Sequence, residues 1–228
     1  RDYCIFTLDM KFCKIFILFI LLNIWLGGCA SHPPVLPQVP KEGETNMGFS
    51  FAVENIIPVI WWKYGINDYT EIGYRLGIPL SGSGVDINRV LMKNKYKWDL
   101  LNLSYNIAPN SSFELSYYIF KAKKSEQVKF GQIPLKTKWK GFRVMFIPDG
   151  RWEESKDNES IRFGFFYGRR FGKKWGAETG YFHDFKGGWS ENKKYPHSYK
   201  NWPTQFSRGT GFSFQLFLYL PSKNNIKK

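Results

Sequence analysis

Apolar residues recur at every second position in a series of short segments between residues 47 and 220. This period of two is typical of half-buried β-strands, and Asn67-Asp68, Pro109-Asn110 and Gly172 supply turn residues between segments. We therefore predict an all-β fold, an antiparallel up-and-down β-barrel of about ten strands, within a range of about 8 to 12. The segments that carry the pattern are 47–54, 59–66, 71–78, 84–88, 101–107, 112–119, 142–146, 163–168, 175–181 and 211–220.

The polar face of these segments favours an apolar face that points outward to lipid. The polar positions are mostly Gly, Ser, Ala and Asn with isolated charges, which suits a narrow lumen where side chains interdigitate. We expect the charges to form a lumen network in which acidic and basic groups face one another, since a buried unpaired charge costs several kcal/mol. The predicted network consists of Glu54, Glu71, Arg75, Asp86, Glu114, Arg143 and Glu178. A soluble lipocalin-like barrel, with the apolar face inward around an apolar ligand, is the alternative.

Connection lengths and aromatic positions add two expectations. The long segments 121–137, 148–159 and 184–207 are expected at one end of the barrel, with short turns at the other. Aromatic residues near strand ends are expected to form girdles at the membrane interfaces. These residues are Tyr69, Trp98, Trp139, Trp175 and Tyr219.

Two hairpins and the last strand resemble small bacterial outer-membrane β-barrel proteins. Residues 64–73, YGINDYTEIG, have the aromatic-Gly strand end, short Asn/Asp turn and Glu/Gly strand of that family, and residues 172–181 are similar. Residues 212–220, FSFQLFLYL, resemble the closing strand that the assembly machinery of the outer membrane recognises. That strand usually ends the protein, whereas this chain continues from Pro221 to Lys228. The resemblance implies a barrel in the outer membrane and supports fold better than activity.

The N-terminal part of the chain resembles a bacterial lipoprotein signal. Met10-Lys11-Phe12-Cys13-Lys14 is a short basic start, an apolar run follows, and Leu26-Gly27-Gly28-Cys29 matches a lipobox. The resemblance implies that Cys29 is acylated and becomes the mature N-terminus, anchored in membrane lipid. We expect residues 1–9 to be upstream sequence, 10–28 the signal peptide, 29–46 the lipidated cysteine with a proline-rich linker, 47–220 the barrel and 221–228 a basic tail.

The linker is expected to act as a semi-rigid spacer between lipid and barrel. Four of the residues from Pro33 to Pro40 are proline, a density that favours extended polyproline geometry. His32 lies at the start of this stretch, and we expect it to be solvated.

Charge and cysteine content restrict the partners. The chain carries a net charge of +14, and its lysines cluster between the apolar segments. Basic loops of an exported protein would meet lipopolysaccharide or another anionic envelope surface rather than nucleic acid. After removal of Cys4 and Cys13 with the leader, only Cys29 would remain, which leaves no disulfide and no free thiol.

Catalytic and metal sites have weak support, so we expect a non-enzymatic protein without cofactor or metal, with a structural, interaction or small-channel role in the envelope. The alternative is an enzyme acting on outer-membrane lipid, like a lipid A deacylase, which would use His197, Ser198 and a nearby acid such as Glu191. His183 lies where a strand runs into the same long segment. Adjacency in a long loop does not place a nucleophile, base and acid within hydrogen-bond reach.

Overall fold

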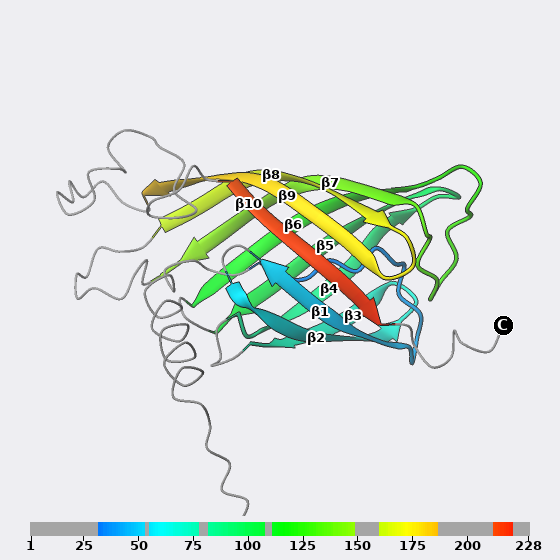
Figure 1. Ribbon diagram of the computed structural model, residues 1–228, viewed down its shortest axis with the longest axis horizontal. Helices are drawn as coiled ribbons and strands as arrows, with labels where there is room; N and C mark the ends of the chain where they lie inside the picture. The colour runs from blue at the N-terminus through cyan, green and yellow to red at the C-terminus, as the bar shows by residue number, and fades with distance from the viewer. Residues whose placement is uncertain are drawn as a thin grey trace, which may run out of the picture.

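Ten antiparallel strands close into a barrel in the computed structural model of the chain (Figure 1). The structure describes residues 32–52, 55–77, 82–107, 111–148, 160–186 and 212–220. Every strand pairs with the next along the chain, and β1 pairs with β10 to complete the circle. The predicted all-β, up-and-down barrel of about ten strands is therefore confirmed. No helix among the described residues is long and apolar enough to cross a membrane.

The strands lie close to the alternating segments of the sequence. Their bounds are β1 (Thr45–Ala52), β2 (Asn55–Asn67), β3 (Thr70–Leu76), β4 (Gly84–Lys93), β5 (Lys97–Asn106), β6 (Ser112–Ala122), β7 (Thr137–Ile147), β8 (Ser160–Phe171), β9 (Trp175–Lys186) and β10 (Phe212–Leu220).

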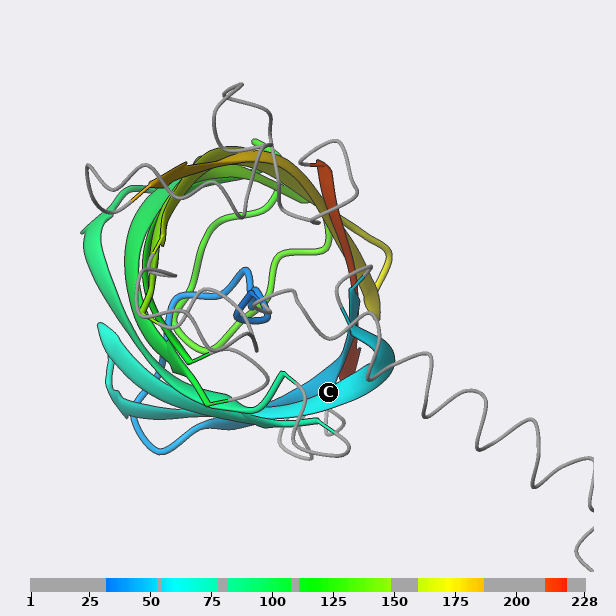
Figure 2. The same cartoon turned by 90° about the vertical axis from the view of Figure 1, so that its left-hand side faces the viewer.

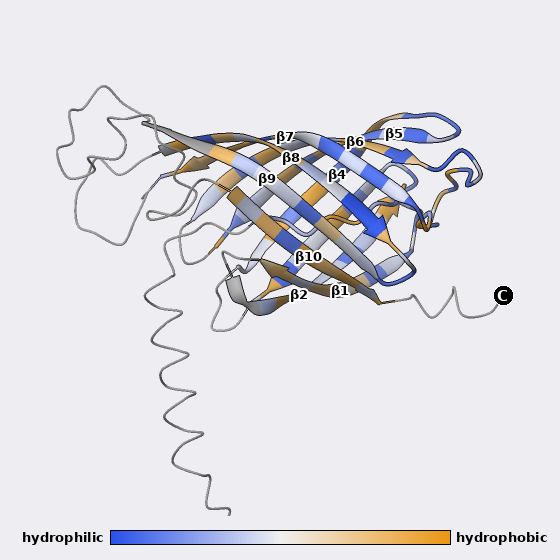
Figure 3. Cartoon of the chain, turned by 45° about the horizontal axis from the view of Figure 1, so that its top comes forward, coloured by the Kyte–Doolittle hydropathy of each residue, from blue (hydrophilic) through white to orange (hydrophobic). Residues whose placement is uncertain are grey.

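The outer surface of the barrel is apolar along most of each strand. Rows of outward side chains run from strand to strand, for example Leu103 of β5 opposite Leu115 of β6 and then Val144 of β7. Large apolar side chains on this surface stay exposed, with Leu103 at 52% and Phe165 at 63%. Hydrophobic (orange) and hydrophilic (blue) residues alternate along the strands in Figure 3, because successive side chains point to opposite faces of the barrel wall. The apolar face thus points away from the lumen, the reverse of what the soluble ligand-binding alternative needs.

The two ends of the barrel differ, and we name them for what they carry. The terminal rim is the end where β1 begins and β10 ends. It also holds the β2–β3, β4–β5 and β8–β9 turns and residues 123–136, which join β6 to β7. The distal rim is the opposite end, where β7 joins β8 and β9 joins β10. The expectation that all three long segments share one end was wrong, because 123–136 connects strands at the terminal rim whereas the other two connections lie at the distal rim.

The inner face divides into two zones. Toward the terminal rim it is lined mostly by buried aromatic and aliphatic side chains from many strands, and toward the distal rim mostly by polar and charged ones, with Met145 and Ile147 as a small apolar cluster there. Glycines make room for the large rings, since a Cβ on Gly168 of β8 would lie 2.1 Å from the Trp139 ring of β7. Small and large residues alternate in this way to fill a narrow barrel.

The N-terminal segment 32–40 passes through the lumen. All nine of its residues are buried, and Figure 2 shows the blue chain running inside the ring of strands. The segment enters β1 at the terminal rim through a turn at Gly43, whose amide nitrogen donates to the carbonyl of Gly65, 2.9 Å away. We call residues 32–40 the plug.

Candidate functional site: the plugged lumen

Apolar side chains of the plug complete the hydrophobic core of the barrel. Val35, Leu36 and Val39 are at most 4% exposed, and they pack in one cluster with inward residues of the wall. The wall residues of that cluster include Trp61, Trp98, Leu100, Tyr118, Phe120, Trp139, Phe166, Phe182, Phe217 and Tyr219. Burying three branched side chains among these rings stabilises the plug inside the barrel, at roughly 25 cal/mol per Å² of apolar area removed from water.

Polar contacts fix the position of the plug along the barrel axis. His32 stacks on Phe182 with ring centroids 4.7 Å apart, and its Nδ1 lies 3.2 Å from Oε2 of Glu114. Gln215 donates from Nε2 to the carbonyl of His32 at 3.3 Å, and the Tyr219 hydroxyl donates to the carbonyl of Val35 at 3.0 Å. Because prolines remove amide donors from this segment, the wall supplies partners for its carbonyl oxygens instead.

Residues 123–136 close the lumen at the terminal rim. Val39 forms a parallel bridge with Phe130, and the Gly131 amide donates to the Val39 carbonyl at 2.9 Å. Gly131 has a φ of 70°, and a Cβ there would lie 2.1 Å from Oε2 of Glu44. Glycine therefore permits both the left-handed turn and the close approach. Burial raises the pKa of Glu44, which lies in this closed mouth just before β1.

Arg143 of β7 is the centre of one charge network. Its Nε lies 2.8 Å from Oε1 of Glu114 and its Nη2 lies 3.1 Å from Oε1 of Glu178. Nη2 also donates to the Tyr118 hydroxyl at 2.8 Å, and the guanidinium lies 4.7 Å from the centroid of the Phe166 ring. All of these side chains are at most 4% exposed. The network joins β6, β7, β8 and β9 across the lumen, and through Glu114 it reaches His32 of the plug.

A second network lies on the other side of the lumen, between β2, β3, β4 and β5. Lys63 Nζ lies 3.0 Å from Oδ2 of Asp86 and 3.5 Å from Oε1 of Glu71. Asn88 donates from Nδ2 to both of these carboxylates at 3.0 Å. Arg75 Nη1 lies 3.7 Å from the other oxygen of Asp86. Each buried charge in this group therefore has an opposite charge close by, which offsets the cost of its removal from water.

The predicted lumen charges are brought together by the fold. The structure places Glu71, Arg75, Asp86, Glu114, Arg143 and Glu178 inside the barrel with ionic partners. Glu54 lies outside the described residues. The sequence interpretation did not include Lys63, which lies on the inward face of β2 with Trp61, and it did not include His32.

Three expectations about position were wrong. His32 is 3% exposed rather than solvated, and residues 32–40 fill the lumen rather than spacing the barrel from a membrane. Trp98, Trp139 and Tyr219 are at most 2% exposed and point inward, so only Tyr69 and Trp175 of the predicted girdle residues lie on the outer surface. The spacer and the girdle residues share one physical reason, because inward rings at the terminal end of the lumen need an apolar partner and the plug provides one.

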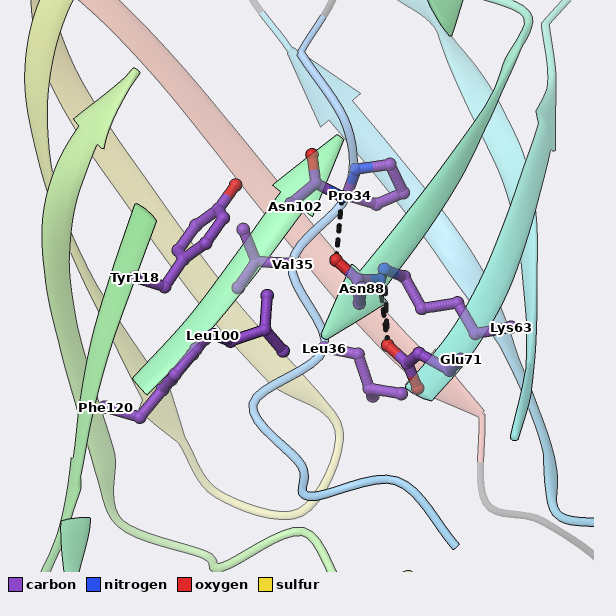
Figure 4. A pocket seen from close by; sticks show the side chains of 10 residues that line it. All are labelled: Pro34, Val35, Leu36, Lys63, Glu71, Asn88, Leu100, Asn102, Tyr118 and Phe120. Carbon is purple, nitrogen blue, oxygen red and sulfur yellow. Dashed lines mark hydrogen bonds and ion pairs between the residues drawn. The ribbon is translucent and has the colours of Figure 1, made fainter. Parts of the chain in front are cut away.

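A pocket beside Pro34, Val35 and Leu36 of the plug is the size of a water molecule. The pocket in Figure 4, between Leu36, Glu71 and Phe120, has a volume of about 10 Å³ for water-sized contents. Ligand sites usually enclose about 300 Å³ or more. This pocket is therefore too small for an apolar ligand.

The residues that the structure describes contain no group of three His, Cys, Asp or Glu that could hold a metal ion. His197, Ser198 and Glu191, on which the lipid-modifying alternative depends, lie outside the described residues. His183 is in β9, and its side chain is also outside the description.

Comparison of the chain with known protein families, with curated proteins and with solved structures finds no match.

Proposed function

We propose that this protein is a lipid-anchored β-barrel of the bacterial outer membrane with a non-enzymatic, structural or interaction role. The observation that supports it best is the division of surfaces, an apolar exterior around an interior filled by paired charges and by the plug. The strands have 7 to 13 residues, and most of them reach the roughly 9 residues that a tilted membrane strand needs. Cys29 is the proposed anchor, through the lipobox that precedes the described residues.

The plug favours a closed barrel over an open channel. A water-filled path would need a lumen wider than the side chains can fill, but the lumen of this barrel already holds nine further residues. The charges of the lumen pair with one another instead of lining an open path. The proposed role is therefore that of a rigid membrane-embedded body that presents its loops and rims to the envelope.

The first experiment separates the lipid-facing barrel from a soluble one. The Cys29→Ser protein, which cannot be acylated, is tested for partitioning between detergent and water, with heat-modifiable gel migration read on the same sample. We expect it to stay with detergent and to shift on boiling, because the strands themselves face lipid. Recovery as a monomer from the water phase without a shift would contradict the proposal.

A charge on the outer surface gives an independent test. Leu103 is exposed near the middle of β5. If it faces the membrane centre, Leu103→Arg should make folding into a bilayer less favourable by about 2–4 kcal/mol. Gln132→Arg, at an exposed position in the 123–136 segment, is the matched control and should change it little. Equal effects of the two substitutions would argue against lipid contact at Leu103.

A further inference from the structure

Four basic side chains lie next to one another on the outer surface of neighbouring strands. Lys97 of β5 pairs with Lys121 of β6, Lys121 pairs with Lys138 of β7, and Lys138 pairs with Arg169 of β8. All four side chains are exposed, and the residue beside each of them along its strand points into the lumen. We call these four residues the basic row.

The protein itself does not neutralise the basic row. Like charges directly opposite one another on paired strands destabilise a sheet. Among the described residues, Asp99 is the one acidic group that forms an ion pair with the row, 3.9 Å from Lys97 Nζ, and it also accepts the hydroxyl of Tyr117 at 2.8 Å. Lys121, Lys138 and Arg169 have no ion pair with any described carboxylate. A row of unneutralised charge at paired positions is suited to an external anion.

The positive charge is concentrated on one side of the barrel. Further exposed lysines lie close to the row on the same strands and the connections between them, namely Lys123, Lys124, Lys136, Lys140 and Lys173. The strand ends and connections beside β5 and β6 are correspondingly blue in Figure 3. By contrast, β10 and β1 place Leu218 and Met47 on the outer surface toward this rim. If the lysines served only to keep the rim soluble, they would not need to gather on the side of β5 to β8.

The row is continuous with the apolar exterior of the same strands. Two residues farther from the terminal rim, Ile119 and Tyr167 flank Lys140, and beyond them Tyr117 pairs with Phe142 and Phe142 with Phe165. A ligand that contacts both the basic row and this apolar surface must be anionic at one end and apolar along the rest. This is the chemistry of a phospholipid with a negatively charged head group, and an acidic protein partner would leave the apolar part unmatched.

We propose that the basic row binds the head groups of anionic phospholipids, with their acyl chains along Tyr117, Phe142 and Phe165. The inference rests on the proposed function, since it needs the outer surface to lie in a membrane. Lysine and arginine side chains hold their charged ends at the membrane surface while their aliphatic stems cover apolar neighbours. Four such groups within one row hold the phosphates of adjacent lipids against β5 to β8.

The test compares lipid binding by two variants of equal charge. In the row variant, Lys97, Lys121, Lys138 and Arg169 are replaced by Gln, and in the control variant Lys41, Lys95, Lys129 and Lys174, which are exposed at the terminal rim, are replaced by Gln. Detergent-solubilised full-length protein is titrated with phosphatidylglycerol or phosphatidylcholine, and bound lipid is counted by native mass spectrometry. We expect phosphatidylglycerol affinity to fall at least tenfold in the row variant and by much less in the control.

Several outcomes would overturn the inference. Equal losses in both variants would mean that net charge, and not the row, attracts the lipid. Equal binding of phosphatidylcholine would remove the role of the anionic head group. Binding of purified lipopolysaccharide but not phosphatidylglycerol would assign the row to a different lipid. Heat-modifiable migration of each variant in the same detergent shows that it is folded, so a folded variant that keeps full binding contradicts this inference and leaves the membrane barrel intact.

Discussion

Arg143 shows at the scale of a single residue what the lumen charges do for the fold. It is 0% exposed, and it is the cation that Glu114 and Glu178 share across three strands. Removing one partner of a buried ion pair is costly because the other partner stays buried without compensation. This cost gives the residue a structural importance that does not depend on any catalytic role.

Replacing Arg143 with Gln should therefore lower the free energy of unfolding by about 3–5 kcal/mol. Urea unfolding in detergent, followed by tryptophan fluorescence, measures the change. Arg169→Gln makes the same chemical change at an exposed outward position of the neighbouring strand, and it should cause no loss of stability.

A rescue variant tests the cause of the loss at Arg143. Adding Glu114→Gln and Glu178→Gln to the Arg143→Gln chain removes the unpaired negative charges, so part of the lost stability should return. If the triple variant is less stable than the single one, unpaired charge is not the main cost.

The sequence predicted the charged residues of the lumen better than their partners. Alternation alone assigned Glu71, Asp86 and Arg143 to the polar face of their strands. The predicted set contained five acidic residues and two arginines, an imbalance that should itself have indicated a missing cation. Lys63 supplies one such charge, but it lies between Trp62 and Tyr64 in a run where both faces are aromatic or apolar, so the period of two did not reveal its direction.

At the scale of elements, the strands were predictable and the plug was not. A strand shows its own pattern, whereas a segment without regular structure is placed only by what it contacts. The sequence did carry an indirect signal, since Val59-Ile60-Trp61-Trp62 and Leu216-Phe217-Leu218-Tyr219 are apolar on both faces. An inward apolar face toward the terminal rim requires an apolar partner inside the barrel, and the Val35-Leu36-Pro37-Gln38-Val39 sequence is such a partner.

The seating of the plug can be tested with single cysteines. In a chain in which Cys4, Cys13 and Cys29 are replaced by Ser, Val39→Cys should react with a water-soluble maleimide only after unfolding, because position 39 is 0% exposed. Glu42→Cys, three residues farther along and exposed, should react in the folded protein. Rapid reaction at position 39 in protein that still shows heat-modifiable migration would mean that the plug leaves the lumen.

At the scale of the whole molecule, the direction of the plug decides on which side of the membrane an anchor at Cys29 would lie. The plug runs from His32 to the terminal rim, and His32 contacts Glu114 of β6 and Gln215 of β10, both near the distal ends of their strands. Two residues, Ala30 and Ser31, lie between Cys29 and His32. An extended chain spans at most about 3.6 Å per residue, so the three steps from Cys29 to His32 cover at most about 11 Å. If Cys29 is acylated and joined to a seated plug, we predict that its anchor lies on the side of the distal rim, opposite the rim where β10 ends.

We predict that the region next to the anchor and the terminal rim label from opposite sides of the outer membrane. In one protein, Gly-Ser-Cys-Gly-Ser inserted between Ala30 and Ser31 places a cysteine next to the anchor. In the other, Glu42→Cys places a cysteine at the terminal rim. If Cys29 is acylated, the introduced cysteine is the single free thiol in each mature protein. A membrane-impermeant maleimide applied to intact cells should label one of the two proteins, and the other should be labelled only after lysis. If both are labelled to the same extent in intact cells, or both only after lysis, then the lipidated chain does not thread the barrel, because a seated plug cannot bring its two ends to one side.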